Sequence, residues 1–223
     1  MSEDHPRLAH LPALGDASVR APGPSHDEVV DHPMRRITRE IAFDPDGWGP
    51  ARAAKVAEVF DGLAPTWHEI AGGDGRLEPL RDALDRGGVD GTGVCLELGS
   101  GTGSATALLA ERFDVVLASD LSLEMLRRAA EEPAVRVQAD ACRLPVRTDA
   151  AHAVVLMNMF LFCNELERVL RPDGALVWIS SLGDRTPIYL SPAEVLEALG
   201  PHWQGVAGRH GEASWCVARR RPS

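Results

Sequence analysis

The chain lacks an excess of basic charge. Its 223 residues include 23 Lys and Arg against 33 Asp and Glu, which gives a formal net charge of −10 at pH 7. A protein that binds phosphate backbones along an extended surface needs a basic face. The longest basic run, Arg219-Arg220-Arg221, is short, and we interpret it as a solvated tail. We therefore expect no nucleic-acid partner.

Long apolar runs and paired cysteines are also absent. No apolar stretch approaches the roughly 18 residues of a membrane span, and the acidic residues 1–6 lack the apolar core of a secretory signal. The cysteines are widely spaced and form no CxxC pair: Cys95, Cys142, Cys163 and Cys216. This spacing argues against a zinc site and against a disulfide framework. We expect free thiols, no bound metal, no membrane span and a cytoplasmic location.

One stretch, residues 94–104, combines an apolar run, an acid and alternating glycines. Its sequence VCLELGSGTGS ends the apolar run near Glu97 and then places glycines at 99, 101 and 103. Glycines allow positive φ and let a ligand approach the backbone closely. The helix-forming residues that follow would offer unpaired N–H groups at a helix start. The pattern predicts a strand, a tight turn and a helix that together hold a nucleoside-containing cofactor.

The first 90 residues are predicted to form a segment that precedes the cofactor-binding core. Residues 1–25 are rich in Pro, Gly, Ala and His, which predicts a flexible or surface-draped segment. A helix is expected over 27–41 with an interruption at Pro33, a second from residue 50 with an apolar stripe, and a third over 77–84. The helix from residue 50 is either a capping helix or a lid. We divide the chain into 1–40, a flexible or draped segment; 41–90, a helical lid region; and 91–223, the core.

Strands and helices alternate through the core. Apolar runs predict strands over 93–98, 114–120, 135–139, 153–157 and 175–180, and a terminal hairpin of 203–207 with 214–218. Such alternation predicts a parallel sheet covered on both faces. The expected fold class is α/β: a Rossmann-like, doubly wound sheet, mostly parallel, with an antiparallel C-terminal hairpin and an N-terminal helical lid.

Polar residues fall at the carboxyl ends of four predicted strands: Glu97, Asp120, Asp140 and Asn158. Ligands of such sheets bind beyond these ends, so the four predict one shared site. A nicotinamide dinucleotide is one candidate, but its G-x-G-x-x-G fingerprint would need glycine where Ser104 stands. Asp120 suits either cofactor class. The acid after the third strand and the terminal hairpin favour a nucleoside-containing cofactor other than a dinucleotide.

Three segments resemble motifs of class I S-adenosylmethionine-dependent methyltransferases. Residues 97–103, ELGSGTG, are similar to the first motif, E/D-x-G-x-G-x-G; residues 140–145, DACRLP, to D-A-x-x-L-P; and residues 166–174, LERVLRPDG, to R-V-L-K-P-G-G. In the last, Arg171 replaces Lys and Asp173 replaces the first glycine. The resemblance runs from about residue 59 to 219 and is strongest to the small-molecule branch that includes ubiquinone and menaquinone methyltransferases.

The resemblance implies a cofactor, S-adenosylmethionine, and a product, S-adenosylhomocysteine. Asp120 would accept from the ribose hydroxyls as a charge-assisted pair, and Asp140 with the backbone of Ala141 would meet the adenine. Glu97 and the carbonyl region of Asn158 would hold the methionine ammonium. The other predicted contacts are loop and flanking residues: Gly99, Ser100, Gly101, Gly103, Leu121 and Met125.

Residues 60–68, FDGLAPTWH, resemble the F-D-x-x-A-x-x-Y-D segment that closes over the cofactor in this branch. Trp67 replaces Tyr and His68 replaces Asp. We expect Phe60 and Trp67 to line the cofactor pocket. His68 is either a general base or an exposed or capping histidine, and Tyr189 either touches the acceptor or packs. We assign no catalytic residue.

The stretch after the fourth strand, residues 160–164, is shorter than in related enzymes. Its Phe160 and Phe162 would leave an apolar patch, which either the N-terminal segment or the second subunit of a homodimer would cover. The expected function is transfer of a methyl group to a small-molecule acceptor by direct displacement. The alternative is a non-catalytic sensor or partner subunit that binds the same cofactor.

Overall fold

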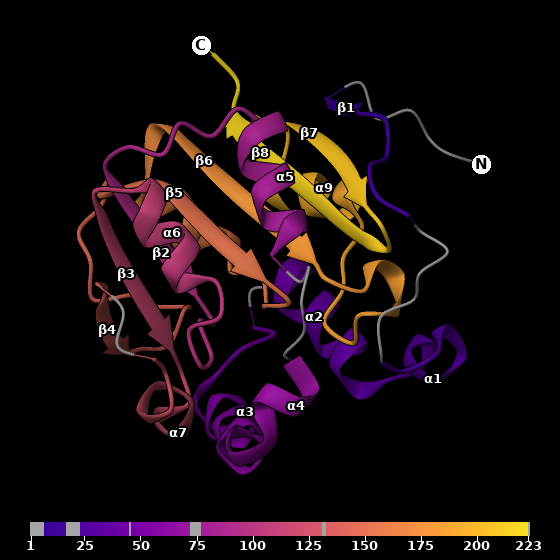
Figure 1. The fold of residues 1–223 in the computed structure, drawn as a ribbon, viewed down its shortest axis with the longest axis vertical. Helices are drawn as coiled ribbons and strands as arrows, with labels where there is room; N and C mark the ends of the chain where they lie inside the picture. Colours follow the sequence, from indigo (N-terminus) through magenta and orange to yellow (C-terminus); the bar gives the residue numbers. More distant parts are fainter. Residues whose placement is uncertain (1–6, 17–22, 45, 72–76, 131–132, 223) are drawn as a thin grey trace.

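A twisted β-sheet runs through the molecule (Figure 1). The computed structural model describes residues 7–16, 23–44, 46–71, 77–130 and 133–222. Within them the strands form one eight-stranded sheet of order β1-β7-β8-β6-β5-β2-β3-β4. Its strands are β1 (Leu8–His10), β2 (Val94–Leu98), β3 (Val115–Asp120), β4 (Val135–Gln138), β5 (Ala151–Met157), β6 (Leu170–Ser180), β7 (Trp203–His210) and β8 (Ala213–Arg220).

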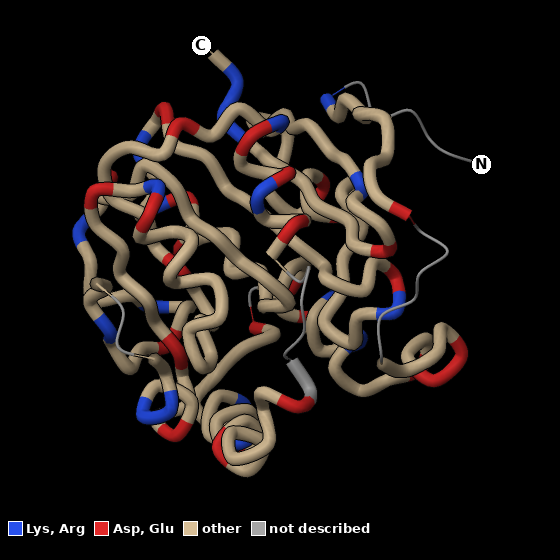
Figure 2. The backbone as a smooth tube through the Cα atoms, viewed as in Figure 1, with Lys and Arg blue, Asp and Glu red and all other residues tan. Residues whose placement is uncertain are grey.

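Neighbouring strands run parallel except where β8 pairs antiparallel with β6 and β7. The predicted fold class, a mostly parallel sheet with an antiparallel C-terminal hairpin, is therefore confirmed. Figure 2 shows Lys and Arg interspersed with Asp and Glu along the backbone around this sheet. No helix in the described parts of the chain is both long and apolar enough to cross a bilayer.

Helices cover both faces of the sheet (Figure 1). They are α1 (His26–Val30), α2 (Pro33–Phe43), α3 (Pro50–Leu63), α4 (Trp67–Ala71), α5 (Glu78–Arg86), α6 (Thr106–Arg112), α7 (Leu123–Arg127), α8 (Cys163–Val169) and α9 (Pro192–Leu199), with short 3₁₀ turns η1 (Ala64–Thr66) and η2 (Gly183–Arg185). On one face α5 and α6 bury Leu80, Leu84 and Leu109 against the sheet. On the other, α2, α8 and α9 contribute to a second core that includes Leu166 and Leu196.

The N-terminal segment joins the sheet, which the sequence pattern did not predict. Leu8 pairs with Gly205 and His10 with Ala207, parallel to β7. Farther along, the Leu11 N–H donates to the Ala207 carbonyl at 2.8 Å. The edge of β7 would otherwise present unpaired backbone groups, and this short strand satisfies part of them.

The predicted lid region also divides differently. α5 lies within the 41–90 segment, yet it packs against β8 and β7 on a face of the sheet. Of the N-terminal helices, α1 to α4 lie near the carboxyl ends of the parallel strands (Figure 1). We therefore propose that residues 23–71, rather than 41–90, act as the lid.

Two segments that lie outside the predicted strands belong to strands in the structure. Residues 171–174 form an irregularity within β6, because Ala151 pairs with Leu170 while Ala153 pairs with Ala175. In the terminal hairpin, β7 continues to His210 instead of ending at the predicted residue 207. The Trp215 indole packs against the backbone of Gly208 in this strand. A Cβ at that position would come within 2.4 Å of the ring, so the close contact requires glycine.

Candidate functional site

The glycine loop after β2 is fastened to the end of β3. The N–H groups of Gly99 and Ser100 both donate to the Ser119 carbonyl, at 2.8 and 3.0 Å. The Gly101 N–H donates to Oδ2 of Asp120 at 2.8 Å. Gly99 and Gly101 have φ of +71° and +56°, a region that favours glycine. The loop is thus held in the tight turn that the glycine spacing predicts.

A cavity of about 450 Å³ opens above this loop, at the carboxyl ends of the parallel strands. Every predicted cofactor-binding residue except Gly103 lines it. These residues are Phe60, Trp67, Glu97, Gly99, Ser100, Gly101, Asp120, Leu121, Met125, Asp140, Ala141 and Asn158. Gly103, with φ of +83°, shapes the turn instead, since a Cβ there would meet Thr106 at 3.3 Å.

Glu97 is a buried carboxylate on the floor of the cavity. Its side chain accepts a hydrogen bond from Thr106 Oγ1 at 2.6 Å, and the residue is 5% exposed. Burial raises the pKa of Glu97 to about 7, and the nearby charge of Asp120 adds to the rise. No basic side chain in the described ranges forms an ion pair with it. A cationic group entering the cavity would therefore stabilise its ionised form.

Asp120 ends β3 and braces both the glycine loop and the next helix. Besides the Gly101 N–H, its carboxylate accepts the Ser122 N–H at 2.8 Å. Burial raises the pKa of Asp120, and these backbone hydrogen bonds oppose the rise. Free lone pairs on the two oxygens remain available to hydroxyl donors.

Asp140 already has a partner that the sequence reasoning missed. The Trp48 indole N–H donates to both of its carboxylate oxygens, at 2.9 and 3.1 Å. The Trp48 ring lies edge-on to Phe162, with centroids 5.2 Å apart, and tilted against Phe160 at 5.7 Å. Trp48 follows a D-P-D-G turn and belongs to no motif, so no local signal marks it.

The aromatic residues after β5 are covered by the chain itself. Phe160 is 2% exposed and Phe162 8% exposed. The Trp48 indole packs against both rings. The Cys163 thiol contacts the Ala42 carbonyl of α2 at 3.8 Å. In the described part of the chain, Ala42 and Trp48 of the predicted 41–90 region cover this place. The aromatic pair therefore gives no exposed patch as an argument for a homodimer.

Asn158 lines the cavity, but its side chain is committed elsewhere. Its Nδ2 donates to Ser181 Oγ at 2.8 Å, and its Oδ1 accepts the Ser181 N–H at 2.8 Å. Its φ of +54° is unusual for a residue other than glycine. The amide thus ties the end of β5 to the end of β6, and only the backbone carbonyl suits the predicted ammonium contact.

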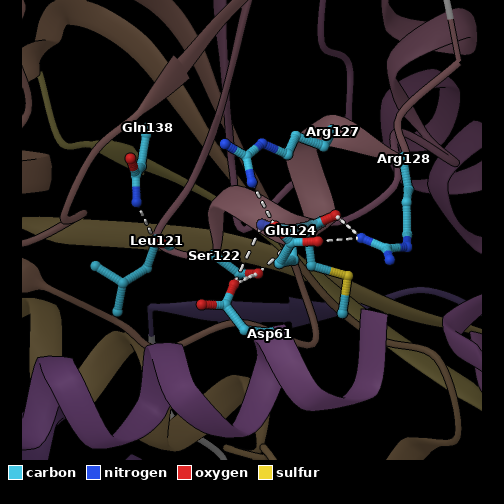
Figure 3. A network of polar contacts seen from close by, with 8 residues as sticks. Asp61, Leu121, Ser122, Glu124, Arg127, Arg128 and Gln138 are labelled. Atoms are coloured by element: carbon cyan, nitrogen blue, oxygen red, sulfur yellow. Dashed lines mark hydrogen bonds and ion pairs between the residues drawn. The ribbon is translucent and has the colours of Figure 1, made fainter. Parts of the chain in front are cut away.

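The lid is docked through Asp61 of α3 (Figure 3). Its Oδ1 accepts hydrogen bonds from the Ser122 hydroxyl and from the Glu124 N–H, the latter at 3.2 Å. On the cavity side, Phe60 and Trp67 pack edge to face with centroids 5.8 Å apart. Trp67 Nε1 would lie 3.2 Å from a Cβ placed on Gly101. α3 is thus held to the start of α7, and the indole lies over the glycine loop.

We expect Asp61→Ala to loosen this lid. Loss of two hydrogen bonds should cost about 1–2 kcal/mol of stability and accelerate amide hydrogen exchange across α3. Glu58→Ala is the matched control, because Glu58 lies on the same helix, is exposed and, among the described residues, forms an ion pair only with Lys55. Equal exchange in α3 for the two variants would show that Asp61 does not anchor the lid.

Three other side chains that could carry chemistry, His68, Tyr189 and His152, lie outside the cavity wall. His68 is exposed beside Glu69, which agrees with the surface alternative. Tyr189 packs under the Arg35 guanidinium, whose carbon lies 5.0 Å from the ring centroid. His152 accepts the Val94 N–H at 3.0 Å at the opposite end of the sheet. Within the described ranges, no group of three or more His, Cys, Asp or Glu is arranged to hold a metal ion.

Comparison with known proteins gives related sequences. Residues 96–178 match the family model described as a methyltransferase domain. The chain is 33% identical over 154 residues to the biotin biosynthesis bifunctional protein BioHC of Cellvibrio japonicus, covering 62% of this chain and 29% of that protein. It is 38% identical over 125 residues to trans-aconitate 2-methyltransferase of an Azoarcus species, covering 50% and 49%. With malonyl-[acyl-carrier protein] O-methyltransferase of a Marinomonas species it shares 36% over 152 residues, covering 62% and 56%.

The chain thus spans between 29% and 56% of these relatives' lengths. Among solved structures, DhpI in complex with SAH superposes with a TM-score of 0.60 at 22% identity, over 75% of this chain and 96% of that one. The DhpI–SAM–HEP complex gives 0.59 at 21% identity, over 74% and 95%. Residues 96–178 are therefore similar to a methyltransferase domain, and the chain around them shares the fold of the DhpI structures.

Proposed function

We propose that the chain binds S-adenosylmethionine in the cavity and transfers its methyl group to a small-molecule acceptor. The observation that carries this proposal is the set of three acids around one cavity: Glu97, Asp120 and Asp140, at or beyond the ends of β2, β3 and β4. Together with the glycine loop, they match the donors that this cofactor offers along its length.

The residues present fit the cofactor. Glu97 is buried and, within the described residues, forms no ion pair, and the more distant charge of Arg136 offsets its burial only in part, so an ammonium would supply a direct counter-charge. Asp120 keeps free lone pairs for the ribose hydroxyls. The apolar side chains of Leu121 and Met125 line the wall beside Asp140, where the adenine would lie. A Cβ at Gly99 would already come within 2.7 Å of Met159, so the bare backbone there leaves no room for any larger side chain.

When bound, S-adenosylmethionine supplies a methyl group already activated on a sulfonium. The chain's own contribution is then mainly to bring the two reactants together in line. Phe60, Trp67 and Trp48 form an apolar cover that excludes water, and Asp61 holds that cover in place. Direct displacement needs no covalent contribution from the protein.

The relatives support methylation of small molecules in general, since two of them are named for transfer to trans-aconitate and to a malonyl group on its carrier protein. Membership of the ubiquinone and menaquinone branch rests on the lid segment alone. We further propose a reducing, cytoplasmic setting, which the four free cysteines support.

A thermal-shift panel tests the cofactor assignment. We expect S-adenosylhomocysteine, and not NADH, to raise the melting temperature, because a ligand stabilises only the fold that binds it. Stabilisation by NADH alone would point to the nicotinamide alternative. Binding of S-adenosylmethionine without turnover of a labelled methyl group against a metabolite library would favour the non-catalytic sensor.

A further inference from the structure

The cavity has a second half that neither the three acids nor the glycine loop lines. In the sheet order β6-β5-β2-β3-β4, the three acids belong to the β2–β4 side. The other side is formed by residues after β5 and β6 and by part of the lid. We assign this half to the acceptor, a step that rests on the proposed function.

The polar groups of this half are few, and two of them are already paired with each other. Asn158 and Ser181 share the hydrogen bonds described above. Thr186, 3% exposed, accepts the Leu182 N–H at 3.1 Å through Oγ1, so its hydroxyl hydrogen is left to donate. The remaining polar side chain is His32. No Lys, Arg, Asp or Glu in the described part of the chain lines this half.

His32 is fixed as a hydrogen-bond donor. It is the N-cap of α2, and its Nδ1 accepts the Met34 N–H at 3.2 Å. A nitrogen that accepts carries no proton, so the ring hydrogen is on Nε2. The Arg35 guanidinium donates to the Thr186 carbonyl at 3.0 Å, which brings this helix start next to the β6 side. His32 and Thr186 thus offer an N–H and an O–H in an otherwise apolar wall.

Two donors without a base restrict the chemistry of the acceptor. An ammonium or a phenol must lose a proton before it can attack, and no group on this side is free to take one. A phosphonate dianion would place two negative charges against a wall that no Lys or Arg of the described residues lines directly, since the Arg35 guanidinium is bound to the Thr186 carbonyl, and this costs more than a single charge. A carboxylate is already ionised at neutral pH, carries one charge and accepts hydrogen bonds.

We propose that the acceptor is an apolar monocarboxylate, held by Nε2–H of His32 and the hydroxyl of Thr186. One carboxylate oxygen forms a bond to the methyl carbon while the bond from that carbon to sulfur breaks, and its electron pair stays on sulfur. The products are a methyl ester and S-adenosylhomocysteine. No proton moves, which agrees with the absence of a base on this side of the cavity.

Four probes that differ in their head group test the assignment: octanoate, octylamine, octylphosphonate and 4-butylphenol. The full chain is incubated with labelled S-adenosylmethionine and each probe in turn, and the products are identified by mass spectrometry. We expect methyl transfer to octanoate only. Transfer to another probe in its place, or no transfer to octanoate, would overturn the proposal.

His32→Asn and His32→Asp form a matched pair. Both side chains cap a helix, but Asn keeps an N–H donor, whereas Asp places a negative charge against the carboxylate. We expect octanoate turnover to fall at least about tenfold further in His32→Asp than in His32→Asn, mainly through KM. Equal turnover in the two variants would remove His32 from the acceptor site.

Calorimetry with S-adenosylhomocysteine tests cofactor binding separately from the choice of a carboxylate as acceptor. Both His32 variants should bind it as the unmodified chain does, because His32 lies on the acceptor side. If the unmodified chain fails to bind it, the proposed function itself fails. If it binds while octanoate is not methylated, only the carboxylate assignment fails.

Discussion

Glu97→Gln is expected to stabilise the ligand-free protein by about 3 kcal/mol above pH 7. The pKa of Glu97 is about 7 in the fold and near its ordinary value when unfolded. Between these values the folded state holds the extra proton, so its stability falls as pH rises, and a shift of this size corresponds to about 3 kcal/mol. Gln does not titrate and still accepts from Thr106.

Denaturant unfolding at about pH 5 and pH 8 measures this effect. The stability of the unmodified protein should fall more between the two pH values than that of Glu97→Gln. Glu111→Gln, an exposed position on α6, is the control and should keep the full pH dependence. If Glu97→Gln keeps it as well, the carboxyl does not titrate in this range.

The same change should weaken cofactor binding. The cofactor's ammonium favours the ionised form of the Glu97 carboxyl. Below pH 7 this carboxyl is protonated and must lose its proton on binding. The affinity for S-adenosylhomocysteine should therefore fall by up to about tenfold for each pH unit below 7. In Glu97→Gln we expect affinity about tenfold to a hundredfold lower at pH 8, without that slope. Calorimetry across this pH range decides, and an unchanged slope in the variant would contradict the assignment.

Asp120→Ala should weaken binding of S-adenosylhomocysteine by about a hundredfold or more. Two charge-assisted hydrogen bonds to the ribose are lost, each contributing roughly 1.5–3 kcal/mol. The N–H groups of Gly101 and Ser122 also lose their acceptor, so the glycine loop and the start of α7 become less ordered.

Asp114→Ala is the matched control for this prediction. Asp114 precedes the same strand at its opposite end, where its carboxylate likewise accepts a backbone N–H, from Gly93 at 2.8 Å. Calorimetry should show unchanged affinity for Asp114→Ala. Unchanged affinity for Asp120→Ala would instead remove Asp120 from the cofactor site.

Most of the fold and most of the cavity wall were predictable because their signals are local. A strand followed by an acid and alternating glycines specifies its own turn, and the carboxyl ends of parallel strands necessarily meet. β1 was not predictable, since a three-residue strand has little pattern and its partner lies almost at the other end of the sequence. Trp48 was missed because its contact with Asp140 exists only once the lid is docked. The commitment of the Asn158 amide to Ser181 likewise depends on two strand ends brought together by folding.

The pairing of β1 with β7 has a consequence for synthesis. Residues 8–10 leave the ribosome long before residues 205–207, the strand they lie beside. A strand this short does not persist alone, and helices as short as α1 and α2 are marginal without a surface to pack on. Pairing β1 with β7 closes a loop of nearly the whole chain, and only the finished sheet offsets the entropy that this costs. The edge strand and the lid are therefore expected to fold after the core. The segments that are synthesised first are thus expected to be among the last to fold.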